Sequence, residues 1–350
     1  MILALGRLTG HAVPFVAFAA LLTGGFIFSF VGPRRPWSEP TRARLYGVLW
    51  PFFLWWTIAL LFLLLAPVAL VARWLLPIST GGVLVTALLV AAAGAVSAFG
   101  GRARVVKRDI FITGLPKAFD GYRLAQISDL HCGPFADGAR VASWVAAVNR
   151  VGADLITVTG DLIANGASYV SVVASALGEL RAPDGVFASM GNHDYFTDAE
   201  ALVKAIEDAG LTMLRNRGVE VSRDGARFYL AGVDDTWSQR HDLARAMAAR
   251  PPGAATVLLA HDPVLFPEAA AHGVELTLSG HTHGGQVALP FLSRRFNLSR
   301  LLSPFTRGLY KMGDATLYVN RGLGTTGPPI RLGSSPEIAV FTLRVAVDAG

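Results

Sequence analysis

The sequence Gly280-His281-Thr282-His283-Gly284-Gly285 follows an apolar run of strand length at residues 274–279. Three further polar blocks follow runs of the same kind, at residues 124–128, 155–159 and 186–190. Those blocks are Asp129-Leu130-His131, Gly160-Asp161 and Gly191-Asn192-His193-Asp194, and a fifth, His261-Asp262-Pro263, follows residues 255–260. Because open α/β sheets place their sites beyond the carboxyl ends of strands, we expect all five blocks to lie there.

These blocks carry enough ligand groups for two metal ions. Asp129 and His131 are two residues apart, so in extended backbone both side chains point to one face and can reach the same ion. The same spacing can aim His281 and His283 at adjacent ions. The potential ligands are Asp129, His131, Asp161, Asn192, His261, His281 and His283. This set is too large for one tetrahedral ion but suits a two-metal centre with a shared carboxylate.

Two ions about 3.5–4 Å apart can bridge a water, acidify it to hydroxide near neutral pH, and clamp the attacking and leaving oxygens of a phosphoryl displacement. The expected chemistry is therefore hydrolysis of a phosphate ester or anhydride. Nitrogen and oxygen ligation without thiolate suits Mn²⁺, Fe or Zn²⁺, and all three stay open. A single Gly-Asp or Asn-His pair is more often a turn, but five blocks in this order leave little room for chance.

The ordered series D-x-H, G-D, G-N-H-D, H and G-H-T-H resembles the calcineurin-like metallophosphoesterase superfamily, and the surrounding residues resemble its bacterial membrane-associated branch. The resemblance runs from about residue 108 to residue 343. It implies an α/β fold, a four-layer sandwich of two mixed β-sheets flanked by helices, with the metals at the strand ends.

The resemblance also implies a role for each block. One ion would be bound by Asp129, His131, Asp161 and His283. The other would be bound by Asp161, Asn192, His261 and His281, with Asp161 bridging. His193 would contact the phosphoryl oxygens or protonate the leaving group, and Asp194 would orient the His193 ring.

The amino-terminal part of the chain is apolar enough for a membrane region. The whole chain has 350 residues, is 52% hydrophobic and has a mean hydropathy of +0.45, which favours a membrane-attached enzyme. Uncharged runs at 12–31, 48–72 and 82–99 are each long enough to cross a bilayer as a helix. The third run, rich in small residues, has a buried core helix as its alternative.

We therefore expect a transmembrane region at 1–101, a basic juxtamembrane hinge at 102–108 and a metallophosphoesterase domain at 109–345. Arginines after the first span and the basic hinge after the third would lie on one side of the membrane, whereas the other side has only Arg7 and Arg73. The positive-inside rule then puts the catalytic domain in the cytoplasm. A single cysteine agrees with a reducing compartment.

The charge distribution argues against a nucleic-acid partner. The pI is 9.8, but residues 1–108 hold ten of the 31 Lys and Arg residues and one of the 25 acidic residues. Beyond residue 108 there remain 21 basic and 24 acidic residues, a net charge near −3. The positive charge therefore serves membrane topology and attraction to anionic headgroups.

Patterns inside the catalytic domain predict helices and a hairpin. Val141, Trp144, Val145 and Val148 have helical spacing. Residues 218–222 and 227–232, around Asp224-Gly225, predict a β-hairpin. The four residues after the run 229–233, which end at Trp237, are expected near the substrate pocket.

Residues 287–311 form a basic and apolar segment directly after the second histidine pair. Such a segment can lie on a bilayer and admit a lipid-linked phosphate. Arg294, Arg295 and Arg300 are the candidate substrate-binding residues. The alternative is a loop packed on the domain with solvated arginines.

The leading hypothesis is a membrane-anchored dinuclear-metal phosphoesterase or pyrophosphatase acting on a phosphate-containing small molecule or lipid. Resemblance to relatives that cleave UDP-diacylglucosamine in lipid A biosynthesis makes an amphiphilic diphosphate the specific expectation. One alternative is a general or cyclic-nucleotide phosphodiesterase. An alternative from another class is a non-catalytic metal-binding membrane scaffold or sensor, although every expected ligand and His193 are present.

Overall fold

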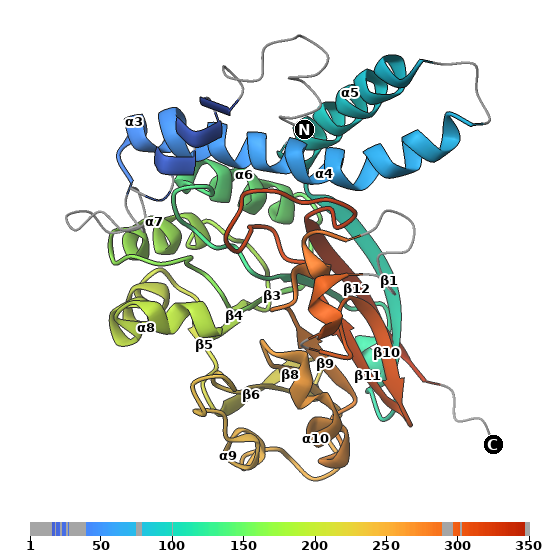
Figure 1. Cartoon of the computed structure of the whole chain (residues 1–350). Helices are drawn as coiled ribbons and strands as arrows, with labels where there is room; N and C mark the ends of the chain where they lie inside the picture. Colours follow the sequence, from blue (N-terminus) through green and yellow to red (C-terminus); the bar gives the residue numbers. More distant parts are fainter. Residues whose placement is uncertain are drawn as a thin grey trace. The chain divides into compact units, whose positions relative to one another are not determined.

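The computed structural model describes residues 40–74, 79–99, 101–288, 297–301 and 303–346, with scattered residues between 16 and 27. The chain divides into two compact units, shown in Figure 1. One unit comprises Met1–Gly101 with Pro328–Leu332, and the other comprises Arg102–Gly327 with Gly333–Gly350.

The first unit is helical where it is described. A continuous helical run from Arg42 to Ala72 consists of α3 (Arg42–Arg44), a π-helical segment (Leu45–Leu49) and α4 (Trp50–Ala72). The other long helix is α5 (Thr80–Phe99). Both helices are long and apolar enough to cross a membrane by length and composition. They contain the runs expected at 48–72 and 82–99, whereas the run expected at 12–31 lies mostly outside the described residues.

Helices α4 and α5 pack together through side chains of different size. The ring of Phe62 on α4 is buried against Ala87 and Ala91 on α5. Small alanine side chains let the two backbones approach, which is typical of helix pairs in membranes.

The second unit contains two mixed six-stranded sheets. The first has the order β1-β12-β2-β3-β4-β5, with bounds Arg104–Ile112, Glu337–Val345, Arg123–Ile127, Leu155–Thr159, Val186–Ser189 and Thr212–Met213. The second has the order β10-β11-β9-β8-β7-β6, with bounds Gly308–Met312, Ala315–Val319, Leu276–Ser279, Thr256–Leu259, Ala226–Gly232 and Arg217–Arg223. The expected hairpin is confirmed, because β6 and β7 pair antiparallel.

Helices cover the outer face of each sheet. They are α6 (Gly138–Asn149), α7 (Ser168–Leu177), α8 (Ala199–Asp208), α9 (Leu243–Met247) and α10 (Phe266–Ala271). Short 3₁₀ turns lie at Lys117–Phe119, Asn192–Phe196, Pro263–Leu265, His283–Gly285 and Leu298–Leu301. In Figure 1, α6, α7 and α8 lie beside the first sheet, while α9 and α10 lie beside the second.

Alternate residues of a strand point to opposite faces of its sheet, so each strand contributes to the core between the sheets and to a core under the helices. In β2, Leu124 belongs to the core between the sheets, whereas Ala125 belongs to the core under α6, α7 and α8. In β7, Leu230 faces the other sheet and Tyr229 packs toward α9. The expected four-layer sandwich of two mixed sheets is thus confirmed.

Helix α6 shows how local sequence builds one outer layer. The Asp137 carboxylate caps it by accepting from the Arg140 amide at 3.0 Å. The residues with predicted helical spacing, including Val141 and Trp144, are all buried against the first sheet. Burial of this stripe stabilises the helix more than its propensity does.

Most of the segment 102–108, which was expected to be a basic juxtamembrane hinge, belongs to a β-strand. Arg104 starts strand β1, which pairs parallel with β12 from Arg104 opposite Glu337 onward. Only Arg102 and Ala103 of the segment 102–108 precede the strand. The basic side chains alone gave no sign of this pairing, because the partner strand lies at the far end of the chain.

Parallel pairing places the site. Strands β2, β3 and β4 are parallel neighbours, as are β7, β8 and β9 in the second sheet. Gln126 joins the sheets at their carboxyl ends, since its Nε2 donates to the Ser279 carbonyl at 3.0 Å. The loops that follow β2, β3, β4, β8 and β9 therefore meet.

Candidate metal centre

The polar blocks after these strands have unusual backbone conformations. Positive φ angles occur at Asp129 (51°), His131 (45°), Asp161 (52°), His281 (69°) and His283 (51°). Non-glycine residues adopt this region rarely, at a cost of about 1–3 kcal/mol each, and such residues cluster at functional sites. Five of the seven predicted ligands are therefore held in strained conformations by the surrounding fold.

Two glycines make room for the polar blocks. A Cβ on Gly191 would lie 2.3 Å from Oδ1 of Asp161, and one on Gly280 would lie 2.3 Å from Oδ2 of Asp129. Any side chain at either position would displace a predicted ligand. Glycine before these blocks is thus required by close packing of one loop on another.

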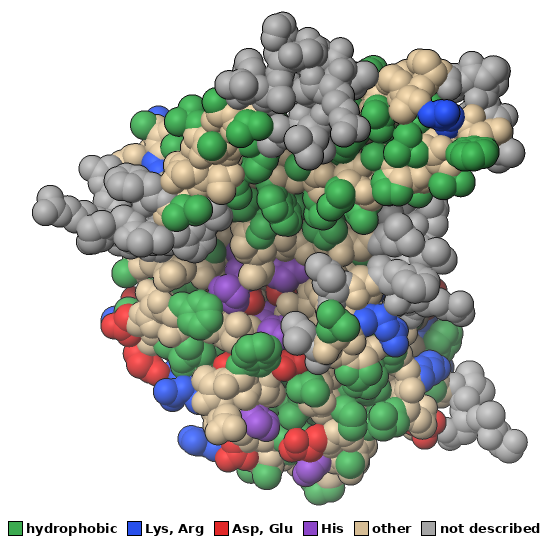
Figure 2. All heavy atoms as spheres, in the orientation of Figure 1, with side chains coloured by type: hydrophobic (Ala, Val, Ile, Leu, Met, Phe, Trp, Pro, Cys, Tyr) green, Lys and Arg blue, Asp and Glu red, His purple; other side chains and the backbone are tan. Residues whose placement is uncertain are grey.

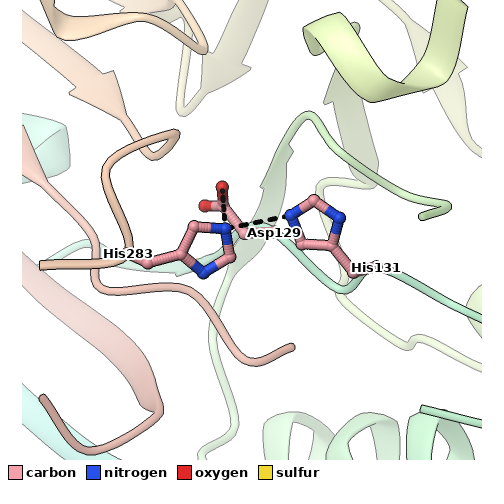
Figure 3. A group of neighbouring side chains, drawn as sticks. All are labelled: Asp129, His131 and His283. Carbon is pink, nitrogen blue, oxygen red and sulfur yellow. Dashed lines mark hydrogen bonds and ion pairs between the residues drawn. The ribbon is translucent and has the colours of Figure 1, made fainter. Parts of the chain in front are cut away.

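One group of predicted ligands combines the ends of β2 and β9. Figure 3 shows Asp129, His131 and His283 pointing toward one another. Nε2 of His283 lies 3.5 Å from Oδ1 of Asp129 and 3.0 Å from Nε2 of His131. All three residues are buried.

A second group combines the ends of β3, β4, β8 and β9. Nε2 of His261 lies 3.2 Å from Oδ2 of Asp161. Nδ1 of His281 lies 3.3 Å from Nε2 of His261 and 3.0 Å from Oδ1 of Asn192. The structure thus brings all seven predicted ligands into two adjoining groups, and Figure 2 shows histidine side chains reaching the surface together on one face.

Asp161 joins the two groups. Its Oδ2 lies 3.4 Å from Nε2 of His131 in the first group as well as 3.2 Å from Nε2 of His261 in the second. Its other oxygen accepts from the His193 amide at 2.9 Å. A single carboxylate therefore faces both groups and is held in place by the turn after β4.

Backbone contacts set the orientation of His261. Its Nδ1 lies 2.7 Å from the Thr159 carbonyl, to which it donates, so Nε2 faces Asp161. A metal-binding histidine usually donates one ring N–H to a carbonyl or carboxylate, and this hydrogen bond directs its other nitrogen at the metal. The same contact joins β3 to the loop after β8.

Burial and neighbouring charges shift the pKa values of three predicted ligands. Burial alone would raise the pKa of Asp161, but His261 and His131 hold that pKa well below its usual value. Burial would lower the pKa of His261, but Asp161 raises it well above its usual value. Burial and the charge of His261 lower the pKa of His281, which favours its neutral, ligating form.

The donor set fits divalent metal ions. Two imidazole nitrogens face each other in each group, at 3.0 Å and 3.3 Å. When both nitrogens of a pair are unprotonated, their lone pairs can bind one cation. With only nitrogen and oxygen donors, the centre suits ions such as Mn²⁺, Fe or Zn²⁺.

His193 lies beside His131 and Asp161. Its ring is perpendicular to that of His131, with centroids 4.6 Å apart. The expected partner of this ring is corrected, because Nδ1 of His193 lies 2.9 Å from the Ala164 carbonyl, to which it donates. The Ala164 carbonyl thus sets the orientation of the His193 ring.

Asp194 has a different contact from the one expected. Its buried carboxylate accepts from the amides of Leu162 at 2.8 Å, Ile163 at 3.3 Å and Gly191 at 2.9 Å. The 3₁₀ turn at Asn192–Phe196 rotates successive side chains by about 120°, so neighbours point apart. Asp194 therefore ties the turn after β4 to the loop after β3.

One nearby hydroxyl group was not predicted from the sequence. Oγ1 of Thr326 lies 3.0 Å from Nε2 of His131 and 2.9 Å from Nε2 of His283. Gln286 holds this residue, since the Thr326 amide donates to Oε1 at 2.9 Å. Thr326 lies in a glycine-rich loop 195 residues after His131, and no sequence pattern in that loop predicts the contact.

The candidate substrate-binding arginines are placed only in part. Arg294 and Arg295 lie outside the described residues. Arg300 is exposed on the 3₁₀ turn Leu298–Leu301. The role expected for the segment 287–311 therefore stays a prediction.

Comparison with known proteins finds relatives for the second unit. The family model described as calcineurin-like phosphoesterase matches residues 122–285, which include all seven predicted ligands. The uncharacterized metallophosphoesterase YkuE of Bacillus subtilis is 34% identical over 239 residues, 66% of this chain and 82% of the relative. An uncharacterized metallophosphoesterase of Aquifex aeolicus is 32% identical over 248 residues, 69% of this chain and 92% of the relative.

A relative from cattle carries a longer chain. The Bos taurus transmembrane protein with metallophosphoesterase domain is 33% identical over 249 residues, which is 66% of this chain. The match spans 55% of that relative.

Proposed function

Because this chain belongs to the calcineurin-like phosphoesterase family and is a metal-dependent phosphoesterase, we propose that it is a membrane-anchored enzyme with two divalent ions. The observation that carries this proposal is the position of Asp161, whose Oδ2 faces a histidine of each ligand group. A carboxylate shared in this way is typical of two-metal hydrolytic centres.

The ligand groups divide between two ion positions. Asp129, His131, Asp161 and His283 would hold one ion, and Asp161, Asn192, His261 and His281 would hold the other. When bound, the ions would supply an acidified water and neutralise the phosphoryl oxygens. The loops after five strands would hold these ligands rigidly, so little reorganisation is needed when substrate binds.

His193 would act on the substrate from the edge of the centre. Its Nδ1–H donates to the Ala164 carbonyl, so Nε2 is the nitrogen that would contact the substrate. In its protonated form, Nε2 would donate to a phosphoryl oxygen or give its proton to the leaving oxygen.

Membrane anchoring is proposed from the two long apolar helices and supported by the name of the bovine relative. The distribution of arginines favours a cytoplasmic catalytic unit. A phosphatase or fluorescent reporter fused to the carboxyl terminus tests this orientation. A reporter that works only when exported would contradict it.

For the substrate, we propose a lipid-linked diphosphate of the UDP-diacylglucosamine kind. The basic and apolar segment 287–311 is the feature that favours an amphiphilic substrate. A general or cyclic-nucleotide phosphodiesterase is the alternative enzyme.

Detergent-solubilised full-length protein, loaded with Mn²⁺, tests the proposal on a panel of substrates. The panel contains a lipid-linked diphosphate, a cyclic nucleotide and a simple phosphodiester, with Asp161→Asn as the inactive control. Faster turnover of the lipid diphosphate supports the proposal, whereas a preference for the other two favours the alternative. If no phosphate ester is turned over in a metal-dependent way, a non-catalytic metal-binding role replaces both.

A further inference from the structure

An exposed tryptophan lies fixed beside the metal centre. The side chain of Trp237 is 60% exposed, yet its Nε1 donates to Oδ2 of the buried Asp262 at 3.2 Å. Its backbone amide donates to Oδ1 of Asp235 at 3.2 Å. A side chain whose backbone and ring nitrogen are both held by hydrogen bonds loses little further freedom when a ligand contacts it.

The Trp237 ring contacts one of the predicted ligands. Its centroid lies 5.4 Å from that of the His281 ring, with an angle of 55° between the planes. His281 belongs to the second ligand group, with His261 and Asn192. A group stacked on Trp237 would therefore lie beside the second ligand group.

A cavity of about 110 Å³ adjoins this ring and His281. Val264, Thr282, Ser299 and Ser303 complete its wall, together with the Asp262 carboxylate. An apolar protein cavity of about 150 Å³ accepts benzene, so this volume is on the order of a single ring. The cavity is too small for a lipid chain or for a second large group of a substrate.

The charge of the cavity selects against anions. Asp262 is the one carboxylate in its described wall, and that wall contains neither lysine nor arginine. The Asp262 carboxylate also accepts from Thr236 at 3.1 Å and from the Val264 amide at 3.0 Å, so it is fixed as well as buried. An uncharged group is favoured here over a second phosphate, because no lysine or arginine of the described wall offsets the repulsion between that phosphate and the Asp262 carboxylate.

We propose that this pocket, formed by Trp237 with the wall around Asp262, binds an uncharged planar ring of the substrate while the phosphoryl group lies at the metal centre. The inference rests on the proposed metal-dependent phosphoesterase function and names a substrate class for it: phosphate esters in which a flat ring is close to the phosphorus. This class competes with the lipid-linked diphosphate proposed from the segment 287–311. Trp237 is thus a specificity-determining residue.

A pair of phosphonates separates the ring from the phosphoryl group. Phenylphosphonate and methylphosphonate present the same head to the metals and differ only in the ring. Calorimetry with Mn²⁺-loaded full-length protein should show that phenylphosphonate binds about tenfold more tightly, as expected for one aromatic contact with ring burial. Trp237→Ala should remove that preference and leave the methylphosphonate Kd unchanged.

Two further variants control for folding and for surface hydrophobicity. Trp237→Phe keeps a ring without the hydrogen bond to Asp262 and should keep most of the preference. Phe111→Ala removes an aromatic side chain that is 59% exposed on β1, and it should keep all of the preference.

The outcomes distinguish this inference from the function on which it rests. Equal binding of the two phosphonates, or a preference that survives Trp237→Ala, would overturn the ring pocket alone. If neither phosphonate binds in a Mn²⁺-dependent way, the proposed metal centre fails and the inference fails with it.

Discussion

Nε2 of His131 and Nε2 of His283 face each other at 3.0 Å, although the two residues come from loops in different sheets. When both nitrogens are unprotonated, their two lone pairs can bind the same cation. The pair therefore makes the first ligand group the most direct test of the metal centre.

Replacing His283 by alanine should remove one ion and most of the activity. We expect the metal content of purified His283→Ala to fall by about half, with hydrolysis reduced about 100-fold or more, because outer-shell changes alone cost 10–100-fold. Elemental analysis and a phosphodiester assay measure the two effects. The matched control is His272→Ala, which removes the exposed histidine that directly follows helix α10. Unchanged metal content in His283→Ala would contradict the assignment of the first group.

Metal affinity should depend on pH through His261. Burial would lower the pKa of His261, but Asp161 raises it well above its usual value, so in the metal-free protein this ring keeps its proton to higher pH than a free imidazole does. Because metal and proton compete for Nε2, affinity should rise about tenfold per pH unit until that raised pKa is passed, and fall as pH decreases. Competition with a chelator of known affinity measures this slope.

Replacing Asp161 by asparagine should move the pH dependence of metal binding. In Asp161→Asn the carboxylate that raises the pKa of His261 is lost, so any remaining pH dependence of metal binding should move to lower pH. A slope that stays in the same pH range in Asp161→Asn would show that another group releases the proton.

His193 should matter for the reaction more than for metal binding. The structure directs its Nδ1 to the Ala164 carbonyl and places its ring beside that of His131. We expect His193→Ala to retain both ions and to lose about 10²–10⁴-fold in kcat, which is the usual contribution of a general acid. Parallel elemental analysis and kinetics separate the two effects. Loss of metal together with activity would instead make His193 a ligand.

The ligand positions were predictable because each is encoded locally. All five residues of strand β3 are buried, so the strand is visible in the sequence as an apolar run. Asp161 follows this run after a single glycine. Parallel order then brings the ends of such strands together. This logic covers all seven predicted ligands, whereas the hairpin of β6 and β7 was predictable from the Asp224-Gly225 turn between its strands.

What the sequence could not predict depends on contacts between distant segments. Thr326 meets His131 across 195 residues of chain, through a loop with no regular pattern. Strand β1 is recognised only by pairing with β12 at the other end of the domain. The direction of the Asp194 side chain depends on a 3₁₀ turn, which apolar periodicity does not reveal.

Asp194 gives a prediction about stability, since its carboxylate holds three amides rather than the His193 ring. Asp194→Asn keeps an oxygen for Leu162 and Ile163 but places an amide group against the Gly191 N–H, which leaves two donors facing each other. An unsatisfied buried donor costs about 1–3 kcal/mol, and in a domain of this size each kcal/mol lowers Tm by about 2–4 °C. Thermal unfolding of the metal-loaded protein measures the shift.

The matched control for this prediction is Asp208→Asn. Asp208 is exposed on α8 and pairs only with Lys204 at 2.8 Å across one helical turn, among the contacts that the structure describes. Surface pairs of this kind contribute about 0.3–0.5 kcal/mol, so Tm should change by no more than about 2 °C. If Asp194→Asn were as stable as Asp208→Asn while kcat fell as in His193→Ala, the carboxylate would act on the His193 ring after all, and the Ala164 carbonyl would not be sufficient to orient it.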